Sequence, residues 1–559
     1  MKIKSCILSL TVILLATVGS LSSSACTCVA ELSRPSIEYF VAITQPKSHT
    51  AQVSMRFNVQ RNQTEIYLSI TQGESIRRQY LQIQNVLADD VLGLPITQLN
   101  NFTWRVNTTR RHEVHVRYSV NYTINRGIYA YIGSDYAVVD EAALLLHPSP
   151  TDRTGFYRVE MEQPSTWMFV SVGAAEQGQI LESPIAELGT HIFAFGSFLV
   201  STVSLGTATL KLALLASVVG ESRTYEKLVC DLYDQFEDTI GKLRKPTVLV
   251  IIAPKALPIV GFCQGASLYV DSTADPSAIS HELFHLWNGV AMYPASNDGI
   301  WFREGVTEYY AKVALFRLGI NGLESRLDPF LYAFRGYNAT IGTPYDVSLA
   351  LAWGRYVDTG DWSFRNVVYE KGQLIAYLIN RTISEKTEGD KNLDDLMRCM
   401  YQAFAHPQTA SRRWFKLDDI KELLTHLTNS SWQDFFNKYI LGSTALPIPE
   451  VEARARYVSS LPWRIEDLRS KVDSLSASSV FRWPVLSFLD SARNETTEAS
   501  KDFFRHRYRQ AEEHMSKASA LVESAQWIER GMWVLIALAL FLGFCLLWKR
   551  RRQVVRIYS

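Results

Sequence analysis

Five consecutive residues, 281–285 (His-Glu-Leu-Phe-His), and one glutamate further along the chain, Glu304, constrain this protein more than any other feature. On a helix, His281 and His285 lie on one face about one turn apart, so both imidazoles can reach a single metal ion. Glu282 lies beside them, where its carboxylate can take a proton from a metal-bound water. A carboxylate from a second helix would complete a set of two histidines and one glutamate, which leaves the fourth tetrahedral position open. The pattern predicts a zinc hydrolase.

The residues around the first motif favour a packed helix over a surface helix that carries two solvated histidines. Residues 275–277 (Asp-Pro-Ser) are typical of a helix start, with proline near the first helical position, and Gly289 is typical of a stop. Leu283, Phe284 and Trp287 would give this helix an apolar side. We therefore expect the two histidines to be held against a hydrophobic core.

A second helix is predicted over residues 301–318, and it carries Glu304. Glu308 lies four residues after Glu304 and therefore on the same face. There its carboxylate can accept the free N–H of a zinc-bound histidine and fix the tautomer of that ring. The alternative is that Glu308 is an exposed glutamate beside Arg303 and Lys312.

At these positions the chain resembles the gluzincin metallopeptidases, in which eighteen residues separate the histidine motif from the zinc-binding glutamate. Residues 286–303 provide this spacing. The amino-acid sequence of residues 281–288 and 301–310 is most similar to that of the glycyl-aminopeptidase family. The aminopeptidase N group is the next most similar. Residues 182–185 (Glu-Ser-Pro-Ile) resemble a segment that precedes the catalytic domain of that family. The resemblance covers residues 35–455.

The resemblance implies one Zn²⁺ per chain with three ligands: His281, His285 and Glu304. It also implies that Glu282 is the general base. Residues 369–372 (Tyr-Glu-Lys-Gly) resemble a motif whose tyrosine stabilises the tetrahedral intermediate in aminopeptidase N relatives. That role for Tyr369 is physically reasonable, because a phenol can donate a hydrogen bond to a developing oxyanion. The alternative is that Tyr369 is a core aromatic residue under the helix of residues 374–378.

The chain departs from the family in two places. Relatives carry a Gly-Gly-Leu-Glu-His-like stretch whose glutamate is thought to hold the free amine of the substrate, whereas residues 261–267 read Gly-Phe-Cys-Gln-Gly-Ala-Ser. Gln264 is therefore the substrate-binding candidate at this position, and its neutral amide offers an ammonium no charge. Glu308 or another acid is left as an alternative amine anchor. The carboxy-terminal PDZ domain of the family is not recognisable either.

The amino-terminal residues predict export. Lys2 and Lys4 precede an apolar run over 6–18, and small residues follow at 23–25 (Ser-Ser-Ala), which is the layout of a secretory signal. Lipidation of Cys26 and an uncleaved anchor are left as alternatives.

The carboxy-terminal residues predict a membrane anchor. Residues 531–548 form an uncharged apolar run just long enough to span a bilayer, and 549–552 (Lys-Arg-Arg-Arg) follow at once. We therefore expect a single-pass membrane protein with a short cytoplasmic tail. Its catalytic body would be exoplasmic, that is periplasmic in a bacterium and luminal or extracellular in a eukaryote.

Strands come first, then a mixed region, then helices, and this order predicts an α+β fold rather than a repeating βαβ sheet. Residues 53–59 and 113–120 alternate as strands do, residues 247–252 predict a strand, and 266–271 predict an edge strand. The predicted organisation is a signal peptide (1–25), an N-terminal β-sandwich-like domain (26–205), a thermolysin-like α/β zinc catalytic domain (206–320), a helical C-terminal domain (321–455), a helical stalk (456–530), a single transmembrane helix (531–548) and a cytoplasmic tail (549–559).

These features together predict a membrane-anchored zinc metallopeptidase that acts like an aminopeptidase on small amino-terminal residues such as glycine. Two alternatives stay open: an endopeptidase of exported polypeptides, and a non-catalytic membrane-tethered binding protein on a gluzincin fold. The expected partners are a peptide or protein substrate and the membrane. Nucleic acid is not expected, because the formal net charge is only +1 and no basic run precedes the tail. The sequence predicts no particular oligomeric state.

Overall fold

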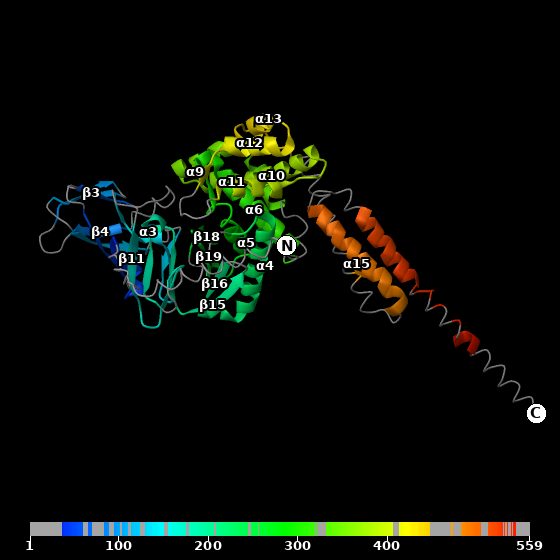
Figure 1. Cartoon of the computed structure of the whole chain (residues 1–559), viewed down its shortest axis with the longest axis horizontal. Coiled ribbons are helices and arrows are strands. Elements are labelled where there is room, and N and C mark those ends of the chain that lie inside the picture. The colour runs from blue at the N-terminus through cyan, green and yellow to red at the C-terminus, as the bar shows by residue number, and fades with distance from the viewer. Residues whose placement is uncertain are drawn as a thin grey trace, which may run out of the picture.

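The computed structural model shows a β-rich part, a central part with a five-stranded sheet, a helical region and a separate pair of helices, in chain order (Figure 1). The residues that it describes are 36–59, 65–69, 83–88, 94–100, 103–109, 113–122, 129–149, 155–174, 178–205, 208–243, 247–254, 257–318, 320, 331–405, 413–447, 471–472, 482–504, 513–528, 530–531, 534, 538 and 540–543. The predicted signal peptide, Cys26 and the predicted tail lie outside these residues.

The described residues of the amino-terminal part form a β-rich domain with three sheets. The largest sheet contains, in spatial order, β13 (Ile180–Pro184), β11 (Phe156–Glu162), β1 (Ile37–Ala42), β2 (Thr50–Asn58), β7 (Glu113–Asn121) and β4 (Ile83–Ala88). The second contains β10 (His147–Ser149), β3 (Glu65–Ser69), β6 (Thr103–Asn107) and β5 (Ile96–Asn100). The third contains β12 (Met168–Val170), β14 (Ile192–Gly196), β9 (Tyr136–Asp140) and β8 (Ala130–Ile132).

One hydrophobic core joins these sheets. Side chains alternate between buried and more exposed along β2, as expected for a strand with one face on a core. Its inward residues, such as Met55, share the core with Val116 of β7, Trp104 of β6 and Phe193 of β14. The predicted strands at 53–59 and 113–120 are confirmed, and they pair with each other antiparallel.

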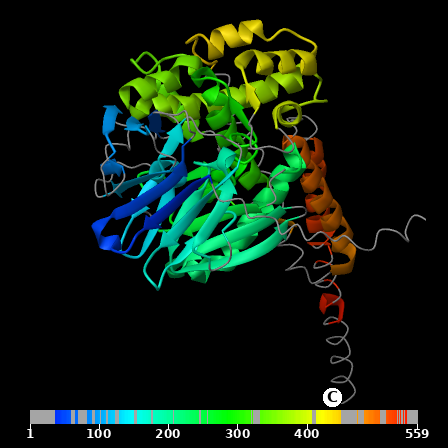
Figure 2. The ribbon, with the colours of Figure 1, turned by 60° about the vertical axis from the view of Figure 1, so that its left-hand side comes forward.

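The central sheet has, among the described residues, five strands in the order β15 (Phe198–Leu205), β16 (Ala208–Leu215), β17 (Thr247–Ala253), β19 (Ser267–Asp271) and β18 (Gly261–Gln264). Both faces of β17 are covered. Leu249 and Ile251 pack with Val138 and Ala194 of the β-rich domain, whereas residues 248, 250 and 252 pack against helices. Figure 2 shows the β-rich domain and the central sheet side by side beneath the helical region.

The predicted edge strand at 266–271 is wrong in one respect. The strand exists as β19, but it is an inner strand, because β18 pairs with it antiparallel and covers its free side. β18 therefore forms the edge of the sheet.

Helices cover the other face of the sheet and then build the rest of the body. They are α4 (Ser222–Ile240), α5 (Pro276–Phe284), α6 (Ile300–Arg317), α8 (Leu331–Thr340), α9 (Leu349–Thr359), α10 (Trp362–Lys386), α11 (Leu393–Phe404), α12 (Leu417–Thr428) and the short α13 (Gln433–Phe435), with a small β20–β21 sheet (Met292–Pro294 and Arg413–Phe415) beside them. The sheet face, α4–α6 and the later helices share one large core. The expected α+β class is thus confirmed, with a β-rich amino-terminal domain and a helical carboxy-terminal region.

Two glycines let α6 and α10 approach closely. A Cβ atom built on Gly305 would lie 2.4 Å from the backbone of Gly372, too close for any real contact. We expect Gly305→Ala to destabilise the protein by about 3 kcal/mol, the upper part of the usual range for an overpacked core. Gly354→Ala on α9 is the matched control, because nothing lies within 4 Å of its Cβ position. Thermal unfolding checks both; equal stability of the two variants would show that this contact is unimportant.

The residues predicted as a stalk contain a helical hairpin. α15 (Arg482–Phe504) packs against a helix over 513–528 through small and aliphatic side chains such as Leu489, Ala492, Ala518 and Val522. Figure 1 shows this pair to one side of the central part and the helical region.

The prediction of a single-pass membrane protein is wrong for the part of the chain that the structure describes. Within this part no helix is long and apolar enough to span a bilayer.

Candidate active site

The two predicted helices bring the candidate metal ligands together. α5 begins after Asp275, whose carboxylate accepts a hydrogen bond from the backbone N–H of Ser277 at 2.8 Å. It ends at Phe284, earlier than predicted, and His285 is the residue that caps it. α6 runs antiparallel over the predicted range and supplies Glu304.

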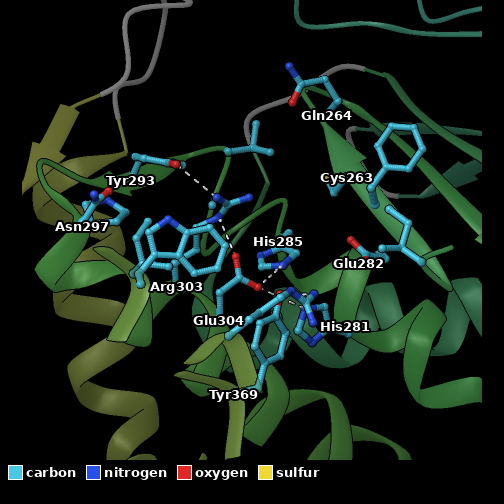
Figure 3. A pocket seen from close by; sticks show the side chains of 18 of the residues that line it. Cys263, Gln264, His281, Glu282, His285, Tyr293, Asn297, Arg303, Glu304 and Tyr369 are labelled. Carbon is cyan, nitrogen blue, oxygen red and sulfur yellow. Dashed lines mark hydrogen bonds and ion pairs between the residues drawn. The ribbon is translucent and has the colours of Figure 1, made fainter. Parts of the chain in front are cut away.

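His281, His285 and Glu304 are all buried, and one ligand atom of each lies within 4.8 Å of the others. The Glu304 Oε2 atom is 3.6 Å from His281 Nε2 and 3.5 Å from His285 Nε2. In Figure 3 the three side chains converge on one point of the pocket floor. The structure thus gathers the three residues that sequence analysis predicted as ligands.

The second ring nitrogen of each histidine, Nδ1, has a hydrogen-bond partner. His281 Nδ1 lies 2.8 Å from Glu308 Oε2, and His285 Nδ1 lies 3.0 Å from the backbone carbonyl of Asn288. In the neutral imidazole that binds a metal, an Nδ1–H donated to either acceptor leaves Nε2 unprotonated and available as the ligand. Glu308 therefore lies where its predicted role requires it.

Sequence analysis missed Asn288. Its side-chain amide donates to the backbone carbonyls of Phe302 and Arg303 at 2.9 and 3.2 Å, so it ties the turn after α5 to the first turn of α6. These two bonds fix the position of Asn288, whose backbone carbonyl is the hydrogen-bond partner of His285 Nδ1. The only sequence signal for Asn288 was its position three residues after His285. Its hydrogen-bond partners, Phe302 and Arg303, lie on α6 and not in the neighbouring sequence.

The donor set fits zinc. Two imidazole nitrogens and one carboxylate oxygen are typical of catalytic Zn²⁺ sites, whereas Mg²⁺ and Ca²⁺ prefer more oxygen ligands. The site also attracts a cation electrostatically. Burial lowers the pKa of His281, but hydrogen bonds and charge from Glu304 and Glu308 outweigh burial and raise the pKa to about 10. Excess negative charge around this imidazole favours a bound cation.

The Glu308→Gln variant tests the interaction between Glu308 and His281. The amide can still accept the His281 hydrogen bond but has no charge, so we expect zinc affinity to fall about tenfold to a hundredfold. Lys312→Gln is the control, because Lys312 contacts the other carboxylate oxygen of Glu308, at 3.3 Å, and does not contact His281. Competition with a zinc chelator gives the affinities. Equal affinities of Glu308→Gln and the wild type would contradict the role of Glu308.

Glu282 is buried and lines the pocket beside the three candidate ligands without belonging to their group. Burial raises its pKa, against the lowering effect of the two histidines. In Figure 3 its carboxylate lies near Cys263, on the opposite side of His285 from Glu304. Gly261 of the edge strand leaves room for it, since a Cβ there would lie 2.9 Å from Glu282 Cγ. A carboxylate with a raised pKa suits a general base.

Tyr369 comes from α10, and its ring stacks on that of His281 with 5.7 Å between centroids. Arg365, one helical turn earlier, donates a hydrogen bond from Nη2 to the Tyr369 hydroxyl at 2.8 Å. Because arginine only donates, this bond occupies a lone pair of the hydroxyl oxygen and leaves the phenolic hydrogen to point elsewhere. Sequence analysis missed Arg365, although a residue four before Tyr369 on a helix is a neighbour by periodicity.

Gln264 lies at the end of the edge strand β18, and its side-chain amide is already engaged. Nε2 donates to the backbone carbonyl of Gly189 in the β-rich domain at 2.6 Å. The next residue, Gly265, has a positive φ and packs so closely on Thr190 that a Cβ would lie 2.2 Å from its carbonyl oxygen. The strand end is thus fixed against the β-rich domain, and Gln264 contributes to that contact.

The pocket that holds these groups has a volume of about 310 Å³. The β-rich domain contributes Tyr129 and Asp140 to its wall, and an aromatic wall comes from the helical region: Trp353, Tyr356, Trp362 and Tyr369. Its acidic residues, among those described, are Asp140, Glu282 and Glu304. Asp140 accepts a hydrogen bond from the backbone N–H of Ala142 at 2.9 Å, and burial raises its pKa to about 8.

Two family models match the chain. The Peptidase M61 N-terminal domain matches residues 38–183, and M61 glycyl aminopeptidase matches residues 276–375. Leucine aminopeptidase 2 of Sclerotinia sclerotiorum is 23% identical over 234 residues, which cover 39% of this chain and 37% of that relative. The chain therefore spans little more than a third of the length of this curated relative.

Solved structures show the same fold. An aminopeptidase N family protein from Idiomarina loihiensis has a TM-score of 0.61 at 17% identity, covering 75% of this chain and 78% of that one. An M1 zinc metallopeptidase from Deinococcus radiodurans has a TM-score of 0.51 at 14% identity, covering 74% and 95%. The predicted resemblance to the glycyl aminopeptidase and aminopeptidase N groups is confirmed, and the chain is aminopeptidase-like in its family matches and fold.

Proposed function

We propose that this protein is a zinc-dependent peptidase that hydrolyses peptide bonds with no covalent intermediate. The observation that carries the proposal is the convergence of His281, His285 and Glu304 beside a buried Glu282 in a pocket large enough for a peptide segment. The M1 zinc metallopeptidase among the structural neighbours supports the choice of metal.

The residues divide the chemistry among themselves. Zn²⁺ held by His281, His285 and Glu304 would polarise the scissile carbonyl and acidify the attacking water. Glu282 takes a proton from that water and passes it to the leaving amine. Tyr369, whose oxygen already accepts from Arg365, donates its own hydrogen to the developing oxyanion.

Tyr369→Phe removes one hydrogen-bond donor and leaves the ring in place. We expect kcat to fall on the order of a hundredfold, with KM changed little, because the bond forms only in the transition state. Steady-state kinetics on one peptide substrate measures both constants. A variant with the wild-type kcat would remove Tyr369 from the mechanism and return it to the role of a core aromatic residue.

We propose that the enzyme acts at the free amino terminus of a peptide whose first residue is small, by similarity to the glycyl aminopeptidase model. Gln264 offers an ammonium no charge, and both oxygens of Glu308 are engaged by His281 and Lys312. Asp140 is the remaining carboxylate on the pocket wall. Because its pKa of about 8 leaves it mostly protonated at neutral pH, we expect amine binding to be weak.

An endopeptidase is the second candidate, favoured by the absence of a carboxylate at position 264. Free and amino-acetylated versions of one peptide separate the two. A strong preference for the free amine, reduced in Asp140→Asn, supports the aminopeptidase. Equal cleavage of both peptides would make the protein an endopeptidase.

A non-catalytic binding protein on the same fold is the third alternative, and it predicts peptide binding without turnover. Incubating a peptide library with the zinc-loaded wild type and the Glu282→Gln variant distinguishes them. Cleavage by the wild type alone excludes the binding protein, whereas binding without cleavage by either would establish it.

A further inference from the structure

Arg365 is held rigidly on the pocket wall. Its guanidinium carbon lies 4.1 Å from the centroid of the Tyr369 ring and 5.1 Å from that of Trp362. Nη2 also donates to the Tyr369 hydroxyl, as described above. Contacts of a guanidinium with aromatic rings and a fixed hydrogen bond restrict the side chain to one orientation. The other N–H groups of this fork, on Nε and Nη1, have no hydrogen-bond partner among the described residues.

Among the residues that the structure describes, Arg365 has no carboxylate as a counter-charge. Other partly buried arginines on α6, α10 and α11 each have a carboxylate within 3.4 Å: Arg303 with Glu304, Arg317 with Asp394, Arg381 with Glu385, and Arg398 with Asp395. No described carboxylate lies within 4.0 Å of Arg365. The acidic group whose charge acts on it is Glu304, which is already shared with Arg303 and the two histidines.

Partial burial of a cation without a partner costs free energy, and a planar guanidinium with N–H groups left over matches a carboxylate. Arg365 lines the same pocket as the candidate metal ligands and contacts Tyr369, the proposed oxyanion donor. A group bound by Arg365 would therefore lie next to the scissile bond.

We propose that Arg365 binds a carboxylate of the substrate residue beside the scissile bond, so that the enzyme prefers acidic peptides. This inference rests on the proposed peptidase function and adds a substrate class to it. The carboxylate can come from an aspartate or glutamate side chain or from the carboxy terminus of a short peptide. The chemistry of recognition is the same in each case.

Matched peptides test the proposal. One pair differs only by glutamate or glutamine beside the cleaved bond, and a second pair ends in a free or an amidated carboxy terminus. We expect the wild type to favour the carboxylate member of at least one pair about tenfold or more in kcat/KM, as for a hydrogen bond to a charged group. Arg365→Gln should bring that ratio to about one, and Arg365→Lys should keep part of it.

Glu237→Gln is the control variant, since Glu237 on α4 does not line the pocket and its replacement should leave the ratio within each pair unchanged. A wild-type ratio near one in both pairs would overturn the proposal. So would an Arg365→Gln variant that slows acidic and neutral peptides equally, because Arg365 would then act only by orienting Tyr369.

A binding measurement separates this inference from the proposed function. Calorimetry on zinc-loaded Glu282→Gln gives the Kd of each peptide without turnover. Tighter binding of the carboxylate member, lost in the Glu282→Gln, Arg365→Gln double variant, supports the anion site even if no peptide is ever cleaved. Equal Kd values within both pairs would exclude the site even in an active peptidase.

Discussion

Replacing Glu282 with glutamine should abolish peptide hydrolysis and leave the zinc in place. The amide has nearly the shape of the carboxylate but cannot accept a proton from water, so we expect kcat to fall by on the order of a thousandfold or more. Zinc content should not change, because Glu282 is not one of the three residues whose ligand atoms converge.

Two measurements on one sample decide this prediction: metal analysis and the initial rate of peptide cleavage. Glu237→Gln is a matched control, since Glu237 is a partly buried glutamate on α4 that does not line the pocket. We expect its rate to stay within about twofold of the wild type, as for a substitution outside the catalytic groups. A fully active Glu282→Gln variant would rule out Glu282 as the general base.

The His281→Ala, His285→Ala double variant should lose both zinc and activity. Two of the three converging ligand atoms disappear, and one carboxylate alone does not hold zinc tightly. Zinc should raise the melting temperature of the wild type, because a ligand that binds the folded state stabilises it, and should not raise that of the double variant.

His281→Gln, His285→Gln keeps more of the side-chain volume and serves if the alanine variant does not fold. In either variant, one zinc per chain and a zinc-dependent melting temperature would show that the metal binds elsewhere. Circular dichroism of the metal-free wild type provides the reference for the fold.

Local patterns predicted much of the fold correctly. The helix that carries Glu304 and the strands at 53–59 and 113–120 have their periodicity and end signals within a few residues of sequence. The position of β19 was wrong, because its neighbour β18 reaches it through the turn at Gly265. The pairing of α15 with the helix over 513–528 was missed for a different reason, because it depends on contacts between two helices that local periodicity does not indicate.

In the candidate site, too, the residues set by local spacing were predicted and those set by tertiary contacts were not. His281, His285 and Glu304 could be named because their spacing on two helices is fixed by helical geometry. Asn288 and Arg365 act through bonds to segments or rings that only tertiary packing brings near. The engagement of Gln264 by Gly189 was likewise not predictable, since the two residues lie 75 positions apart in sequence.

Zinc content and peptide turnover, measured together on the purified wild-type protein, test the central claim most directly. We expect about one zinc per chain, cleavage of a free-amine peptide, loss of cleavage when a chelator removes the metal, and recovery when zinc is returned. Undiminished cleavage by metal-free protein, or zinc-loaded protein that cleaves no peptide of a broad library, would contradict the account.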